Sequence, residues 1–143
     1  MEHEDTTILA IFRQARTIAV VGLSPDPSRP SHVVARYLKS QGYRILPVNP
    51  AAGAVLGEKS HPDLLSIGEG VDVVDVFRRP EHVPAIVDQA IRIGARALWL
   101  QEGVVHPEAA EKARKAGLLV VMDRCMLKEH RRLCDKGLLA APG

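Results

Sequence analysis

Short apolar runs alternate with amphipathic segments along the whole chain. The runs are apolar almost throughout instead of alternating with polar residues, which is typical of strands covered by helices on both faces. They predict five strands, at residues 17–21, 43–48, 71–77, 95–100 and 118–122.

The segments between these runs have a helical spacing of apolar residues, which predicts helices at 7–15, 30–41, 80–93, 107–116 and 126–133. Pro80 and Pro107 stand where a first-turn proline is tolerated, and Gly42, Gly94 and Gly117 each follow a helical segment. The connection 51–65 is expected to hold an edge piece at Val55 and a brief helix after His61.

This alternation predicts an α/β fold: a Rossmann-like, doubly wound, five-stranded and mainly parallel sheet with helices on both faces. We expect one domain over residues 1–143, with a leading helix in 1–15 and a loose tail in 134–143.

The composition of the chain argues against a membrane protein, a secreted protein and a nucleic-acid-binding protein. The 143 residues are 46% hydrophobic, with no apolar run long enough to span a membrane and no secretion signal at the start, so we expect a cytoplasmic protein. A net charge of +2 and 3% aromatic residues argue against nucleic-acid binding. Cys125 and Cys134 are expected as reduced thiols. The single asparagine, with plentiful arginine, alanine and proline, favours a thermophilic or GC-rich source.

Ligands of open parallel sheets bind beyond the carboxyl ends of the strands, so the residues after each strand are the candidates. After the first strand, Gly22 permits close approach of a ligand, while Ser24, Ser28 and Ser31 offer hydroxyls. The helix start adds unpaired N–H groups and Arg29 a forked cation. Together they predict a phosphate site; the alternative is a tight turn whose serines only cap the helix.

The other strand ends are also polar, and they are mostly basic. The positive groups expected along this edge are Arg29, Arg78, Arg79 and Arg124, with His32 nearby. This excess favours a ligand with several phosphates. The alternative is that Arg78 and Arg79 are solvated and paired with Glu81 or Asp75.

A classical dinucleotide site is not indicated. Only Gly22 remains of the G-x-G-x-x-G motif, and Asn49 stands where an NAD site has an acidic residue. The Walker A motif is absent as well. An NAD(P)-linked oxidoreductase on the same fold therefore stays an alternative that observed NAD binding would revive.

The candidates for catalysis are few. Asp75 lies in an apolar strand, where it is either a base or, more readily, bonded to a loop N–H or an arginine. Cys125, beside Arg124, is either a reactive thiolate or a half-buried packing residue. The histidines lack metal-ligand spacing, so we expect neither catalytic nor metal-binding residues.

Five stretches, in order, carry a family resemblance: IAVVGLSPDPSRPSH, YRILPVNP, VDVVDVFRRPEHVP, ALWLQEGV and GLLVVMDRCM. They cover residues 18–126. On these stretches the chain resembles the small CoA-binding proteins, which are stand-alone relatives of the CoA-binding domain of succinyl-CoA synthetase α-subunits.

The resemblance implies coenzyme A as the ligand and assigns parts of it to particular residues. The CoA phosphates are assigned to Ser24, Pro25, Asp26, Pro27, Arg29 and His32. Asn49 and Pro50 are then expected to border the nucleotide, and Leu100, Gln101 and Glu102 the pantetheine arm. The glycine-rich loop of the ligases is replaced by residues 25–30, and their lysine after the second strand by 51–54, so Arg29 is expected to stand in for it.

The ligases act through a phosphorylated histidine in a further domain that has no counterpart here. The resemblance therefore implies that the chain binds CoA or an acyl-CoA without catalysing a reaction. A CoA-sensing subunit of a larger acyl-CoA enzyme is the remaining alternative.

Overall fold

Five parallel strands form the central sheet of the computed structural model, which describes residues 3–140. They are β1 (Thr17–Val21), β2 (Arg44–Val48), β5 (Val73–Val76), β6 (Ala97–Leu100) and β7 (Leu119–Val121). Their order across the sheet is β2-β1-β5-β6-β7, and each neighbouring pair is parallel. The predicted Rossmann-like α/β class is confirmed.

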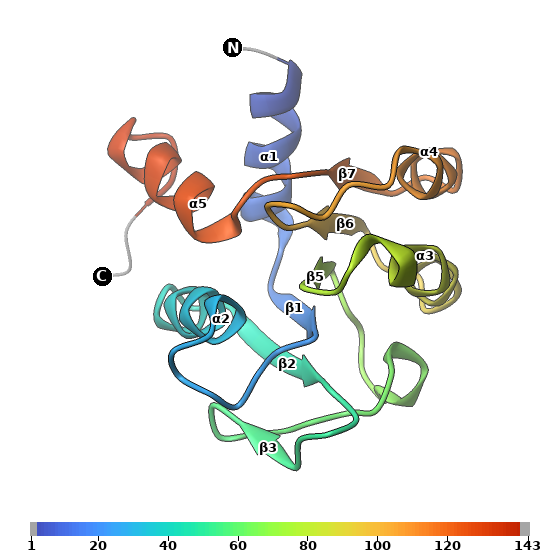
Figure 1. Ribbon diagram of the computed structural model, residues 1–143. Helices are drawn as coiled ribbons and strands as arrows, with labels where there is room; N and C mark the ends of the chain where they lie inside the picture. The colour runs from blue at the N-terminus through green and yellow to red at the C-terminus, as the bar shows by residue number, and fades with distance from the viewer. Residues whose placement is uncertain (1–2, 141–143) are drawn as a thin grey trace.

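Helices cover both faces of this sheet (Figure 1). They are α1 (His3–Gln14), α2 (Pro30–Ser40), α3 (Val83–Arg92), α4 (Pro107–Lys115) and α5 (Met126–Asp135). One buried cluster joins α1, α2 and α5 to one face of the sheet, and a second joins α3 and α4 to the other. None of the helices in the described range 3–140 is long and apolar enough to cross a bilayer.

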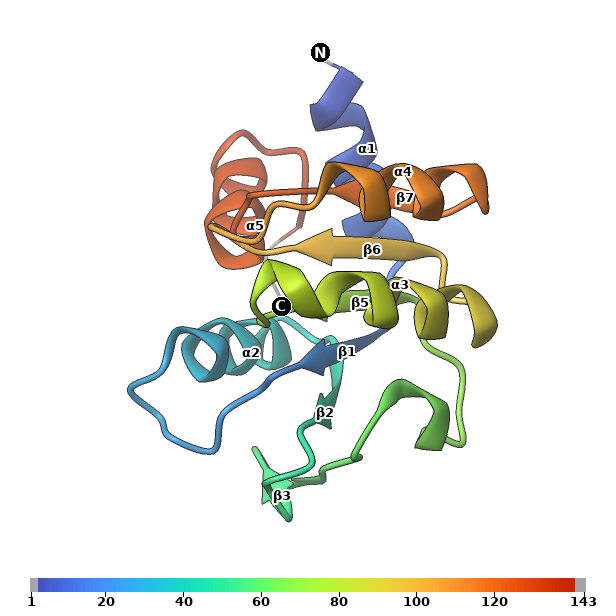
Figure 2. The ribbon, with the colours of Figure 1, turned by 45° about the vertical axis from the view of Figure 1, so that its right-hand side comes forward.

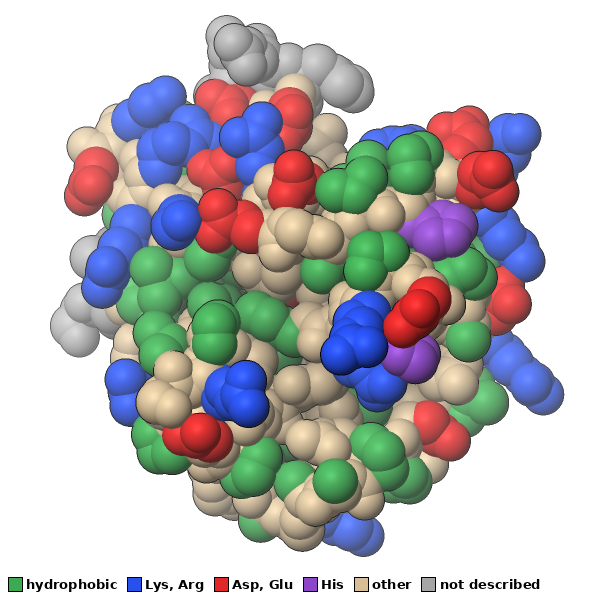
Figure 3. All heavy atoms as spheres, in the orientation of Figure 1, with side chains coloured by type: hydrophobic (Ala, Val, Ile, Leu, Met, Phe, Trp, Pro, Cys, Tyr) green, Lys and Arg blue, Asp and Glu red, His purple; other side chains and the backbone are tan. Residues whose placement is uncertain are grey.

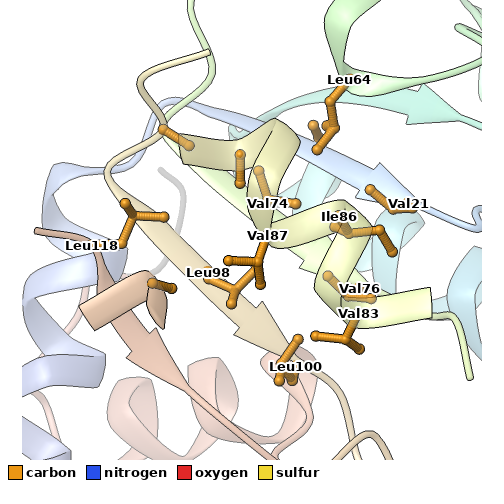
Figure 4. Packing of buried hydrophobic residues seen from close by; sticks show 14 of the residues in the cluster. Val21, Leu64, Val74, Val76, Val83, Ile86, Val87, Leu98, Leu100 and Leu118 are labelled. Carbon is orange, nitrogen blue, oxygen red and sulfur yellow. The ribbon is translucent and has the colours of Figure 1, made fainter. Parts of the chain in front are cut away.

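Burial explains why the strand runs are continuously apolar. Successive side chains of a strand point to opposite faces, and both faces here are covered. Val74 and Val76 of β5 belong to the cluster that includes Val83 and Val87 of α3, whereas Val73 belongs to the opposite cluster. Figure 4 shows the α3 side chains packed against those of β5 and β6.

The piece expected at Val55 is a strand, but it pairs outside the main sheet. β3 (Ala54–Val55) and β4 (Glu58–Lys59) form a separate antiparallel hairpin. Leu56 and Gly57 both have positive φ at its turn, as a two-residue hairpin connection requires. The brief helix after His61 is the 3₁₀ turn η1 (Leu64–Ser66).

The helix predicted over 80–93 is divided in two. A 3₁₀ turn, η2 (Pro80–His82), precedes α3, and the amide of Val83 donates to the carbonyl of Pro80. Pro84 lacks the N–H that an α-helical bond to Pro80 would need, so the first turn tightens. Two prolines four residues apart therefore set the true start of α3.

The C-terminal segment is packed rather than loose up to residue 140. Gly137, with φ of 74°, ends α5, and the amide of Leu138 returns to the carbonyl of Leu133. Leu138 and Leu139 pack against the α1–α2–α5 cluster, and Arg13 donates to the carbonyl of Leu138 at 3.1 Å. The tail expected from residue 134 is thus wrong for 134–140, because two leucines bury apolar surface there. Residues 141–143 lie outside the described range.

Candidate ligand-binding site

The carboxyl ends of the strands meet at one edge of the sheet, and a groove lies along it. The arrowheads of β1 and β6 in Figure 2 point toward the side from which the loop before α2 projects. The groove has a volume of about 410 Å³. It is lined by Pro30, Val34, Phe77, Arg78, Arg79, Pro80, Gln101, Glu102, Gly103, Val104 and Cys125.

The strand order places the first loop at the centre of this edge. From β1 the chain continues to β2 on one side, while β5, β6 and β7 lie on the other side of β1. The order of the strands therefore reverses at β1, and sheets of this kind bind ligands at such a switch point. Gly22 follows β1 with φ of +86°, and its amide donates to the carbonyl of Val48 at 2.8 Å. A Cβ on Gly22 would lie 2.6 Å from the carbonyl oxygen of Phe77, so glycine lets the loops after β1 and β5 touch.

The loop that follows is fixed by its own hydrogen bonds. Ser24 accepts from the amide of Asp26 at 3.1 Å, and Ser31 accepts from the amide of Ser24 at 3.0 Å. Both hydroxyls thus hold the loop backbone, and Ser31 is itself buried. The amide and hydroxyl of Ser28 both bind the Asp26 carboxylate, and these bonds lower the pKa of Asp26. Asp26 therefore shapes the loop as a carboxylate.

The side chains of His32 and Asn49, two further predicted residues, form hydrogen bonds with the backbone of this loop. His32 is buried, and its Nδ1 lies 3.0 Å from the carbonyl oxygen of Ser24. Since a carbonyl only accepts, Nδ1 donates to it. The side-chain Nδ2 of Asn49 donates to the carbonyl of Leu23 at 3.0 Å, and its Oδ1 accepts from the backbone N–H of Ala51 at 2.9 Å. Both residues thus act on the loop backbone.

Helix α2 begins at this loop without a side-chain cap. Arg29 occupies the N-cap position, Pro30 follows it, and the first turn contains no acidic residue. The amides of Arg29 and His32 bond to the carbonyls of Asp26 and Arg29, and Pro30 has no N–H. The start of α2 therefore offers mainly the positive end of the helix dipole beside the groove, which Pro30 lines. This start of α2 is suited to an anion.

The arginines near α2 keep their charge largely unneutralised. Within residues 3–140, neither Arg78 nor Arg79 forms an ion pair, and Arg29 reaches Asp26 only at 3.9 Å. Glu81 instead lies 3.8 Å from His82. The alternative in which Arg78 and Arg79 pair with Glu81 or Asp75 is therefore wrong.

Beyond β7, by contrast, the charges cancel. Arg124, expected as a free cation, forms ion pairs with Glu4 at 2.7 Å and Glu129 at 3.7 Å. Lys128 pairs with Glu102 at 2.9 Å, an interaction that raises the pKa of Lys128. Acidic and basic side chains are interspersed over α1 and α5 in Figure 3. A larger hollow of about 720 Å³ lies there, lined by these paired groups.

A buried polar pair lies next to the groove. Asp75 is fully buried on β5, which raises its pKa to about 7. Its Oδ1 accepts from Nε2 of Gln101 at 2.8 Å, and its Oδ2 has no partner. The expected bond to a loop N–H or an arginine is thus wrong. The partner is a side chain just past the neighbouring strand, which sequence spacing did not reveal.

The remaining predicted residues are distributed as follows. Arg78, Gln101 and Glu102 line the groove itself. Pro25, Pro27 and Pro50 are exposed on the adjoining loops, while the side chain of Leu100 is wholly buried in the core. In the described range, no cluster of three or more His, Cys, Asp or Glu residues is suited to a metal ion.

The apolar lining of the groove was missed by the sequence reasoning. Phe77, Gly103, Val104 and Val34 line it, as does the half-buried free thiol of Cys125. Cys125 was already a candidate, as either a reactive thiolate or a half-buried packing residue, and it is half-buried. Phe77 could have been found in the same way, because it stands just past the end of β5.

Comparison with known proteins assigns most of the chain to a family. The sequence model of a family described as "CoA binding domain" matches residues 16–131. The chain is 38% identical over 123 residues to an uncharacterized protein, YneT, of Bacillus subtilis, covering 86% of this chain and 91% of that protein.

Solved structures share the fold. A protein from Thermus thermophilus is 46% identical with a TM-score of 0.85, over 93% of this chain and 99% of that one. A protein from Pyrococcus horikoshii is 42% identical with a TM-score of 0.87, over 91% and 92%.

A larger enzyme is related to this chain over one part of its length. The ADP-forming acetate–CoA ligase I of Archaeoglobus fulgidus is 23% identical over 121 residues. The match covers 78% of this chain but only 18% of that ligase.

Proposed function

The chain belongs to the CoA binding domain family, and we propose that it binds coenzyme A or an acyl-CoA along the carboxyl edge of its sheet, without itself catalysing a reaction. The match over residues 16–131 covers the sheet and the groove. The proposal extends to a cytoplasmic protein formed by one domain, and the Thermus and Pyrococcus relatives support a thermophilic source.

The observation that carries this function is the set of unneutralised arginines beside the uncapped start of α2. Arg78 and Arg79 line the groove without a carboxylate partner, and Arg29 is weakly paired at the N-cap. Phosphates bound there would gain charge-assisted hydrogen bonds, worth about 1.5–3 kcal/mol each.

The rest of the groove fits a long, mostly neutral arm. Phe77, Val104 and Val34 supply apolar wall, and Gln101 supplies an amide. The charge of Glu102 is neutralised by Lys128, so this part of the groove has little net charge. A ligand with phosphates at one end and an uncharged chain at the other matches this arrangement.

The NAD(P)-linked alternative has less support. The position at the end of β2 is Asn49, whose side-chain amide binds the backbone of Leu23 and Ala51. An acidic residue that would bind a ribose hydroxyl is therefore replaced by a group already engaged in holding the first loop.

The test is a thermal-shift panel of CoA, acetyl-CoA, NAD, NADP and ATP, confirmed by calorimetry. A ligand at about 100 times its Kd adds about 2.7 kcal/mol of stability, which is readily measured. We expect CoA or acetyl-CoA to raise the melting temperature and NAD to have no effect. Stabilisation by NAD but not by CoA would replace this function with the redox alternative.

The CoA-sensing subunit is the second candidate, because the Archaeoglobus ligase carries a region like this chain within a longer protein. Affinity capture with and without CoA separates the two. A partner retained only when CoA is present favours the sensor, and its absence under both conditions favours the stand-alone module.

A further inference from the structure

Asp75 is a costly residue for the fold. It is wholly buried in β5, whose other members are valines, and Oδ2 has no hydrogen-bond partner. Burial disfavours its charged form, which raises its pKa to about 7. A valine would satisfy the strand pattern without this cost, and such exceptions to local rules are typical of functional positions.

The side chain of Asp75 forms its one hydrogen bond within residues 3–140 with Gln101, a residue of the groove. Gln101 lines the groove and donates from Nε2 to Oδ1 of Asp75 at 2.8 Å. None of the described residues donates a hydrogen bond to Oε1 of Gln101. Among the described residues, the one wholly buried side-chain polar atom without a partner is Oδ2 of Asp75, so Oε1 is not wholly buried. Gln101 is 3% exposed as a whole, and Oε1 retains part of that small exposed surface. Because Nε2 is fixed inward, the oxygen end of the amide is presented to the groove.

We propose that Asp75 is a positioning residue, which holds the Gln101 amide so that Oε1 meets the ligand and selects a hydrogen-bond donor there. This inference rests on the proposed function. In CoA the donors outside the nucleotide are the two amide N–H groups and the secondary hydroxyl of the pantetheine arm, and the terminal thiol. Acylation removes only the thiol donor. Comparing CoA with acetyl-CoA therefore distinguishes the thiol from the other donors of the arm.

The test measures the affinities of CoA, acetyl-CoA and 3′-phospho-ADP, which lacks the arm, by calorimetry. Asp75→Val removes the acceptor and keeps a β-branched side chain, whereas Asp75→Asn keeps an acceptor oxygen. For Asp75→Val we expect CoA to bind about tenfold more weakly, the effect of one hydrogen bond to a fixed group. Binding of 3′-phospho-ADP should be unchanged, and Asp75→Asn should restore most of the CoA affinity.

A second variant separates positioning from a general effect on the fold. Gln101→Met should cause the same loss of CoA affinity, and adding Asp75→Val to it should cause no further loss, because the group that Asp75 positions is gone. Thermal unfolding of each variant, without ligand, verifies that it is folded.

The outcomes distinguish the possible failures. A loss shared by CoA and acetyl-CoA supports the proposal and assigns the donor to an amide or the hydroxyl of the arm, whereas a loss confined to CoA supports it and assigns the thiol. Full CoA affinity in Asp75→Val overturns the proposal, as does an equal loss for 3′-phospho-ADP. If the wild-type chain binds no CoA, the proposed function fails, and the inference with it.

Discussion

Gly22 and Phe77 approach so closely that a Cβ on Gly22 would lie 2.6 Å from the carbonyl oxygen of Phe77. The contact joins the loop after β1 to the loop after β5, on the two sides of the switch point. Gly22 also has φ of +86°, which side chains other than hydrogen rarely allow.

Gly22→Ala is therefore expected to destabilise the protein more than an ordinary glycine replacement. The positive φ alone costs about 1–3 kcal/mol, and the contact with Phe77 adds to it. Gly94→Ala is the matched control, since Gly94 has φ of +74° but nothing within 4 Å of the added carbon. Denaturant unfolding of both variants measures the difference. Equal losses would show that the loops separate without cost.

Asp75 is expected to make stability fall as pH rises from about 4 to about 7. Its pKa is raised from 3.8 to about 7 in the folded protein, so the folded state binds the extra proton in this interval. The slope from this one group is about 1.4 kcal/mol per pH unit. Asp75→Asn should remove it and be the more stable form above the folded pKa. Parallel curves for both proteins would contradict the assignment.

Arg29→Ala is expected to weaken CoA binding about tenfold or more, since one charge-assisted hydrogen bond is lost. Stability should change little, because Arg29 is exposed and its one ion pair within residues 3–140, with Asp26, is 3.9 Å long. Arg36→Ala, at an exposed position of α2, is the control for the loss of a positive charge. Calorimetry at two salt concentrations measures both variants, and unchanged affinity for Arg29→Ala would remove it from the site.

Asn49→Asp is expected to lower both CoA affinity and stability. It adds a negative charge near the proposed nucleotide position, and it replaces the donor that binds the carbonyl of Leu23 with an acceptor. Leaving the carbonyl of Leu23 without its donor lowers the free energy of unfolding by about 1–3 kcal/mol. Unfolding and CoA titration of the same variant test the two effects. A fully stable variant would show that this bond contributes nothing to the loop.

The sheet was predictable because its strands are buried on both faces and so are apolar without interruption. Thr17–Val21 is found at its predicted bounds for this reason. The start of α3 could not be predicted in this way, because it depends on the missing N–H of Pro84 and not on the spacing of apolar residues. Likewise, Leu138 and Leu139 gave no periodic signal, although they pack against the core.

The site was predictable in position but not in electrostatics. The rule that ligands bind at strand ends locates Arg78 and Gln101 correctly on the groove. The neutralisation of Arg124 by Glu4 joins residues 120 positions apart, and the pairing of Asp75 with Gln101 requires knowing that β5 and β6 are neighbours. Long-range contacts of this kind decide which charges remain free.

The uneven neutralisation of charge gives the groove a direction. Arg78 and Arg79, which follow β5, leave positive potential on that side of the groove, while Lys128 neutralises Glu102, which follows β6. A ligand charged at only one end can therefore be bound in one orientation, with its neutral end always delivered beside Gln101 and Cys125. The reverse orientation would move the phosphates away from Arg78 and Arg79 to a part of the groove where Glu102 and Lys128 neutralise each other.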